Sequence, residues 1–153
     1  MVRETDQVVK SSDDRSRPLI GVLLSTPFQT VDENVHQALQ GAGYTDIRPA
    51  HHIVFRLTGP GGARLVDLAD RALMTKQSMG YLVNHLETCG YLERAPDPHD
   101  GRAKILQLTP LGRQVEHTAR TAILTLQEHW AAQLGDEAFD ELLSLLRRLN
   151  QCL

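Results

Sequence analysis

The stretch that decides the fold is Asp-Pro-His-Asp-Gly-Arg-Ala-Lys, at residues 97–104. Its Pro, Asp and Gly residues are typical of a tight turn. The segments on either side of it, residues 92–94 and 103–108, have the composition of two short strands. The stretch therefore predicts a β-hairpin with Arg102 projecting from its tip.

Four helices are expected before this hairpin. Apolar residues spaced four, three, four and four positions apart from Leu24 to Leu39 mark the first helix. Pro27 lies inside that stripe, so we expect the helix to be kinked or broken there. Glycines and N-capping residues bound the other three helices. These are expected over residues 49–57, 65–73 and 75–90.

Two long helices are expected after the hairpin. Thr109 followed by Pro110 is a strong helix start, because Thr caps the first turn and Pro fits the first helical position. That helix is expected to run to about residue 133, since Gly135 and Asp136 break the pattern. The last helix carries apolar residues that we expect to be buried: Phe139, Leu142, Leu143, Leu146 and Leu149.

Two short helices followed by a hairpin are the layout of a winged helix. The predicted fold class is therefore mainly α with a small β-hairpin wing, a winged helix-turn-helix flanked by helices from both ends of the chain. Winged helices mostly bind DNA. We expect residues 1–16, which are polar and charged, to form a disordered tail, and residues 17–153 to form one domain.

Composition narrows the class of protein. With 153 residues and 41% hydrophobic content, the chain is large enough for one domain with a core. We find no run long enough to span a membrane and no secretory signal, and expect a cytoplasmic protein. The two cysteines, Cys89 and Cys152, form no disulfide or zinc pattern. The net charge of −3 requires that any cationic surface for nucleic acid be local.

The chain resembles the MarR family of bacterial winged helix-turn-helix regulators. Three motifs carry this resemblance in order: Glu93-Arg94, the Asp-Pro-x-Asp-x-Arg series from Asp97 to Arg102, and Leu108-Thr109 with Gly112. The resemblance implies a homodimer, with residues 17–47 and 109–153 as dimerisation helices and residues 48–108 as the winged DNA-binding lobe. It further implies a pseudo-palindromic operator with half-sites roughly 34 Å apart.

The outward arc of the fourth helix is the predicted base-reading surface. Gln and Asn side chains can pair with adenine in the major groove, and Lys can reach guanine or phosphate. The alternative is an ordinary solvated helix face. The predicted contacts here are Thr75, Lys76, Gln77, Ser78, Tyr81, Asn84 and His85.

The wing is the second predicted DNA contact. A narrow minor groove attracts an inserted guanidinium, which favours Arg102, and we expect Asp100 to accept from Arg102 and fix its orientation. The alternative is an ordinary surface salt bridge. Arg64, Arg94 and Lys104 are predicted phosphate contacts. The family often has a second basic residue where this chain has Gly101, so wing contact is expected to be weaker or more flexible.

The family resemblance also implies a cleft for a small aromatic or phenolic effector. Arg48, His51 and Phe55 are the candidate effector contacts, with dimer-interface packing as the alternative. We expect no metal site, because the adjacent His51 and His52 point to different helix faces. No cofactor motif and no catalytic set of residues is present, so an enzyme is not expected.

The sequence therefore predicts a DNA-binding transcriptional regulator, a homodimeric repressor released by a small ligand. Two alternatives remain open. One is a winged helix that binds protein instead of DNA, and the other is a redox-responsive regulator that uses Cys152. The operator, the effector and the sign of regulation do not follow from the sequence.

Overall fold

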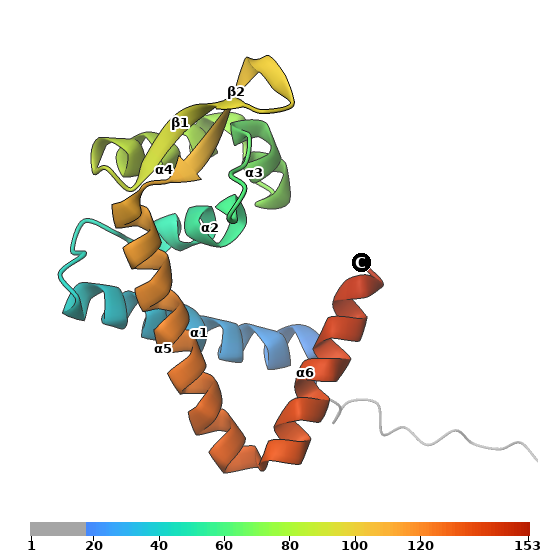
Figure 1. The fold of residues 1–153 in the computed structure, drawn as a ribbon. Helices are drawn as coiled ribbons and strands as arrows, with labels where there is room; N and C mark the ends of the chain where they lie inside the picture. Colours follow the sequence, from blue (N-terminus) through green and yellow to red (C-terminus); the bar gives the residue numbers. More distant parts are fainter. Residues whose placement is uncertain (1–17) are drawn as a thin grey trace, which may run out of the picture.

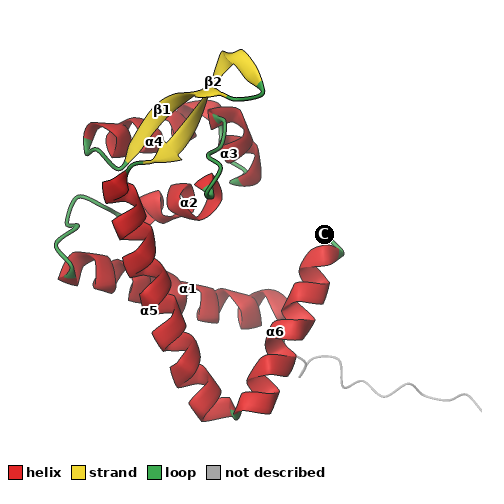
Figure 2. Ribbon diagram, in the orientation of Figure 1, coloured by secondary structure: helices red, strands yellow, loops and turns green. Residues whose placement is uncertain are grey.

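The computed structural model describes residues 18–153, which form six helices and one two-stranded antiparallel sheet (Figure 1). The predicted tail at residues 1–16 lies outside the described residues. The fold class is confirmed: the described chain is mainly helical and carries a β-hairpin wing (Figure 2). In chain order the elements are α1 (Ile20–Gly41), α2 (Pro49–Thr58), α3 (Leu65–Arg71), α4 (Lys76–Thr88), β1 (Leu92–Asp97), β2 (Asp100–Leu108), α5 (Pro110–Leu134) and α6 (Asp136–Gln151).

Of the expected kink or break at Pro27, the break does not occur: α1 runs through Pro27 as one helix. The missing amide of Pro27 leaves one carbonyl of the preceding turn without its helical partner. This half of α1 is exposed: Leu23 is 54% and Phe28 52% accessible. Water can therefore satisfy the free carbonyl, so the helix continues through the proline.

The core lies where α2, α3, α4 and the hairpin meet the end of α1 and the start of α5. Apolar residues at helical spacing point into it from each element, as the sequence pattern predicts. Burial of a large aliphatic side chain contributes about 1.5–3 kcal/mol. The fully buried side chains include Leu39, Ile47, Val54, Leu68, Met79, Val83, Leu86, Leu106 and Val115.

The wing is tied to the segment that precedes α3. The amide and carbonyl of Ala63 pair with the carbonyl and amide of Leu106 at 3.0 and 2.8 Å, so this segment adds one bridge to the edge of β2. Gly62 permits the approach because its φ is +78° and a Cβ there would lie 2.7 Å from the Leu106 oxygen. The hairpin is thus held to the body of the lobe along its base, while its tip projects beyond the helices (Figure 1).

Helices α5 and α6 form a V that leaves the lobe (Figure 1). The Thr109 hydroxyl caps α5 by accepting from the Gly112 amide at 3.0 Å, as predicted. The expected burial of the last helix is wrong for a single chain. Only Phe139 of α6 is buried, because α6 packs mainly against α5 and its other side faces solvent.

Exposed apolar residues concentrate on the three terminal helices. A single exposed aliphatic side chain is normal on a protein surface, but a group of them on one surface is typical of a site that contacts another molecule. No described helix is both long and apolar enough to cross a membrane. The exposed apolar residues of these helices include Leu19 just before α1, Ile20 and Leu23 of α1, Leu124 and Leu134 of α5, and Leu142, Leu145 and Leu149 of α6.

Candidate functional site

Helix α4 presents its polar arc to solvent because its apolar arc is held in the core. Met79, Val83 and Leu86 are fully buried. The Thr75 hydroxyl caps the helix by accepting from the Ser78 amide at 3.1 Å. The residues that this leaves exposed are the predicted ones: Lys76, Gln77, Ser78, Tyr81 and Asn84.

His85 does not belong to this exposed arc. Its ring is half-buried, its Nε2 lies 2.9 Å from the Asp46 carbonyl, and it stacks on His51 with ring centroids 4.5 Å apart. The prediction that placed His85 with the DNA-facing residues ignored these partners, which lie far away in the sequence. His85 instead joins α4 to α2 and to the loop before α2.

Two of the predicted phosphate contacts are engaged in ion pairs. Arg94 is paired with Glu87 at 2.8 Å, and its guanidinium also donates to the Asn84 side chain at 3.4 Å. Arg64 is paired with Asp97 at 2.6 Å. These contacts brace the wing against α4 and against the segment before α3.

The predicted side-chain pair between Asp100 and Arg102 does not form. Asp100 accepts instead from the backbone amide of Arg102 at 3.1 Å, which closes the turn, and its other oxygen lies 3.5 Å from Arg64. A carboxylate two residues before an amide readily makes this local turn contact. Within residues 18–153, the exposed side chains of Arg102, Lys104 and Lys76 have no ion-pair partner.

Charge is divided unevenly along the chain. Residues 48–108 contain eight Lys and Arg and six Asp and Glu, which gives this lobe a net charge of +2. The whole chain has −3, so the remaining residues carry −5. The lobe with the exposed helix arc and the wing is therefore the cationic part of an acidic protein, as phosphate binding requires.

We expect the ionised carboxylate of Asp97 to stabilise the folded protein at neutral pH. The backbone amide of His99 and the guanidinium of Arg64 lower the pKa of Asp97 below its ordinary value. A carboxyl group with a lowered folded-state pKa stabilises the protein above its unfolded-state pKa and loses that effect as the pH falls. We expect Asp97→Asn to lower the melting temperature at pH 7, and we expect the difference from the parent to shrink toward about pH 3.

Thermal unfolding across this pH range checks the expectation for Asp97. Asp70→Asn is the control, because Asp70 is exposed and makes no side-chain ion pair within the described chain. A loss of stability that is equal at pH 7 and pH 3 would contradict the role given to the Asp97 carboxylate.

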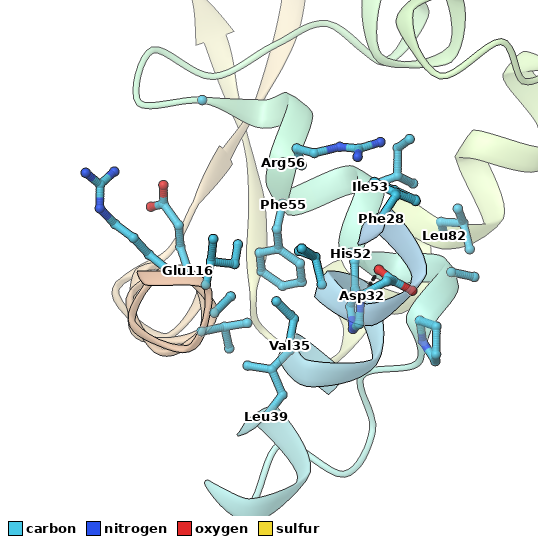
Figure 3. Close-up of a pocket in the computed structure, with 18 of the residues that line it drawn as sticks. Phe28, Asp32, Val35, Leu39, His52, Ile53, Phe55, Arg56, Leu82 and Glu116 are labelled. Carbon is cyan, nitrogen blue, oxygen red and sulfur yellow. Dashed lines mark hydrogen bonds and ion pairs between the residues drawn. The ribbon is translucent and has the colours of Figure 1, made fainter. Parts of the chain in front are cut away.

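A cavity of about 950 Å³ lies between α1, α2, α4 and α5 (Figure 3). This is the size and location of a site for a small molecule. Most of its wall is apolar, with Phe28, Val35 and Phe55 among the lining residues. Ser78 and Tyr81 of α4 line it as well, so the cavity reaches the helix that carries the exposed polar arc.

Of the three predicted effector contacts, only Phe55 lines the cavity. Arg48 and His51 do not line it; at the start of α2 the Arg48 amide donates to His51 Nδ1 at 3.0 Å, and the His51 ring stacks on His85. Burial and the neighbouring His85 lower the pKa of His51 to about 4. His51 is therefore a neutral packing residue between α2 and α4.

The polar residues of the cavity wall were missed by sequence reasoning. Asp32 lies within the apolar stripe of α1, and its carboxylate is 2.8 Å from Nδ1 of His52 on α2. A single carboxylate inside an apolar stripe was the available signal, but its partner lies twenty residues away. Among residues 18–153, no three acidic, histidine or cysteine side chains form a group that suits a metal ion.

Both cysteines are unpaired in the described chain. Cys89 is half-buried near His85, with its Sγ 3.7 Å from Nε2, and Cys152 is exposed at the end of α6. Burial raises the pKa of the Cys89 thiol. A raised pKa lowers the thiolate fraction, which is the reactive form.

Comparison with known proteins supports this reading of the fold. Residues 45–103 match the model of the MarR family. No curated protein matches the chain. Among solved structures, the transcriptional regulator Tm0710 from Thermotoga maritima is 27% identical, with a TM-score of 0.61, over 87% of this chain and 92% of that one.

Two other solved structures share the fold at lower identity. Wild-type MarR from E. coli is 20% identical with a TM-score of 0.69, over 88% of this chain and 98% of that one. CouR from Rhodococcus jostii RHA1, solved with p-coumaroyl-CoA bound, is 23% identical with a TM-score of 0.67, over 91% of this chain and 95% of that one. The segment from the loop before α2 to the wing is therefore similar to the MarR family, and the described chain shares the winged-helix fold of these solved structures.

Proposed function

We propose that the protein is a homodimeric DNA-binding transcriptional regulator, a repressor that a small ligand releases from its operator. The observation that carries this proposal is the pairing of an exposed polar arc on α4 with a wing whose Arg102 and Lys104 have no partner in the described chain. Both lie on the cationic lobe.

Helix α4 is suited to the major groove. Gln77 and Asn84 can each pair with an adenine edge, and Lys76 can reach guanine or phosphate near the start of the helix. Gly80 adds no side chain between them, and a Cβ there would meet nothing within 4 Å. With α4 in the major groove, the wing lies over the adjacent minor groove. Arg102 can then insert into that minor groove, where the negative potential is strong.

A dimer places two such lobes on one DNA duplex. The exposed apolar residues of α1, α5 and α6 supply the surface for it, in agreement with dimerisation through residues 17–47 and 109–153. In a two-fold dimer the same surface of each copy meets its equivalent. Two lobes that face one side of the duplex contact half-sites roughly 34 Å apart.

The cavity gives a route for release by a ligand. It is lined by α1 and α5 of the dimerisation region and by Ser78 and Tyr81 of α4, so an occupant touches both parts. Ligand binding by CouR supports this role for the same fold. A ligand weakens DNA binding only as far as it binds better to the form of the dimer that does not fit the operator.

Removal of the wing guanidinium tests the DNA-binding proposal. We expect Arg102→Ala to weaken duplex binding about tenfold, because each dimer loses two charged groove contacts. We also expect the slope of log K against log salt to become shallower by about one to two units. Binding is measured by fluorescence anisotropy across a range of salt concentrations, first on random duplex and then on the upstream region of the gene itself.

Arg147→Ala is the matched control for Arg102→Ala. Arg147 is exposed on α6, outside the cationic lobe, so its loss removes the same charge without a groove contact. If both variants bind alike, Arg102 has no role at the wing. If the parent protein shows no salt-dependent binding to any duplex, the regulator proposal fails and a protein-binding winged helix replaces it.

A further inference from the structure

Two side-chain amides lie on the exposed arc of α4, and they have different surroundings. Gln77 and Asn84 are two helical turns apart, so they lie on the same face of the helix with about 10 Å between them along its axis. Gln77 Nε2 lies 3.4 Å from the Tyr81 hydroxyl, and Asn84 Oδ1 lies 3.4 Å from the Arg94 guanidinium. These partners decide which edge of a base each amide can read.

The guanidinium of Arg94 is held in place from both ends of its side chain. At its base, Arg94 lies in β1 opposite Leu106, which is fully buried. At its tip, Nε donates to Glu87 Oε1 at 2.8 Å and Nη2 donates to Glu87 Oε2 at 2.8 Å. A bidentate pair of this kind fixes the plane of the guanidinium as well as its position. Arg94 therefore presents Nη2 to Asn84 in a defined geometry.

This geometry leaves one orientation for the Asn84 amide. A guanidinium only donates hydrogen bonds, so the amide atom that faces it must be the oxygen. With Oδ1 turned to Arg94, the Nδ2 group lies on the other side of the amide, and it makes no hydrogen bond within residues 18–153. Asn84 thus offers two N–H donors to an approaching base, while its acceptor is directed toward Arg94.

The Gln77 amide is not restricted in this way. The Tyr81 hydroxyl both donates and accepts, so either end of the Gln77 amide can face it. Gln77 therefore keeps the arrangement of one donor and one acceptor that pairs with adenine. The two amides on this helix face are different readers, although they carry the same functional group.

The chemistry of the bases converts this difference into a sequence preference. Guanine presents two acceptors in the major groove, O6 and N7, whereas adenine presents N7 beside the amino donor at N6. An amide that offers only donors satisfies both guanine acceptors. Against adenine it leaves the amino group without an acceptor, which costs free energy once water is excluded.

We infer that Arg94 is a positioning residue for base reading: it turns the amino group of Asn84 toward the DNA, so that Asn84 selects guanine over adenine. This inference rests on the proposed function and narrows it, because it names the base that one residue of α4 reads. It also gives Arg94 a role other than phosphate contact, since Glu87 already balances its charge at 2.8 Å.

Selection from a pool of random duplexes by the full chain tests the inference, followed by anisotropy on the selected duplex and its single-base variants. The base pair read by Asn84 is the one where Asn84→Ala removes the preference, and Gln77→Ala marks its own base pair likewise. With about 10 Å between the residues and about 3.4 Å per base pair, the two should lie about three base pairs apart. At the Asn84 position we expect the parent to bind guanine at least about fivefold more tightly than adenine.

Two variants assign this preference to Arg94. Arg94→Met frees the Asn84 amide to pair with adenine, so it should lower the guanine-to-adenine ratio at least about fivefold at the Asn84 position and leave the Gln77 position unchanged. A purely structural role would instead weaken binding to all duplexes alike. Arg94→Lys keeps a group that only donates, so it should retain the parental ratio. The salt slope should stay unchanged in Arg94→Met, and a shallower slope would make Arg94 a phosphate contact.

Arg71→Met is the control, and it should keep the parental ratios at both positions. Arg71 is an exposed cation of the same lobe, but its guanidinium donates to the Leu57 carbonyl and not to an amide of α4. A parent that prefers adenine at the Asn84 position, or an Asn84→Ala protein with unchanged preferences, would overturn the inference. So would an unchanged ratio in Arg94→Met, or a ratio in Arg94→Lys as low as in Arg94→Met.

Failure of the inference is distinguishable from failure of the proposed function. A parent that selects a defined duplex but gives one of these contrary results is still a DNA-binding protein, and only the role of Arg94 fails. A parent that selects no sequence from the pool contradicts the proposed function itself.

Discussion

Replacement of Leu142 by Glu is expected to dissociate the proposed dimer. Leu142 lies on the apolar stripe of α6, is 41% exposed in the single chain, and has no covering element within it. A charge placed in a buried apolar interface costs several kcal/mol unless it is paired. Because a two-fold interface contains the residue twice, we expect the dimer Kd to rise by at least about 100-fold.

The loss of the dimer should carry over to DNA binding. A single lobe holds only one half-site and loses the gain from simultaneous binding of two, which is about 100-fold or more. Sedimentation velocity gives the oligomeric state, and anisotropy on the same samples gives the DNA affinity. Ser144→Glu is the control, since Ser144 is exposed on the side of α6 opposite the apolar stripe. A Leu142→Glu protein that sediments as the parent does would refute dimerisation through α6.

Replacement of Gly112 by Ala is expected to destabilise the fold by about 3 kcal/mol or more. Gly112 is buried in the first turn of α5, and a Cβ there would overlap the carbonyl oxygen of Tyr91. That same carbonyl accepts from the Thr109 amide at 3.1 Å. The clash is therefore with backbone that is fixed by the entry into α5, and no side-chain rotation relieves it.

Chemical denaturation followed by circular dichroism measures the effect at Gly112. Gly80→Ala is the matched control: Gly80 is also helical, but a Cβ there has open space around it. By helix propensity, Gly80→Ala should stabilise the protein by up to about 1 kcal/mol. A shift of the unfolding free energy in the same direction by Gly112→Ala and Gly80→Ala would contradict the clash between residue 112 and the Tyr91 carbonyl.

The order of helices and strands was predictable because its signals are local in the chain. Thr75 and Thr109 cap the helices that follow them, and Gly90, with φ of +80°, ends the turn after α4. The two errors in the fold have a common cause. The surroundings of each helix decide whether Pro27 breaks α1 and whether α6 is buried. The spacing of apolar residues along a helix gives no information about these surroundings.

The candidate site was predictable only in part, for a related reason. Exposure of Gln77 and Tyr81 follows from the position of the apolar residues on their own helix. The ion pair between Arg64 and Asp97 joins residues 33 positions apart, and the pair of Asp32 with His52 joins residues 20 apart. Charge pairs of this kind are set by the packing of separate elements, so the spacing of residues along one element gives no sign of them.

The bridge between Ala63 and Leu106 limits how the protein can transmit a signal. It fastens the wing to the segment before α3, beside the Arg64–Asp97 ion pair, so we expect the proposed DNA-binding lobe to move as one unit. If a ligand binds in the cavity as proposed, we expect it to act by rotating one whole lobe relative to the other lobe of the proposed dimer. Sensitivity to the ligand is therefore expected to vary with the helical phasing of the two operator half-sites, because each lobe keeps its shape and changes only its orientation relative to the other.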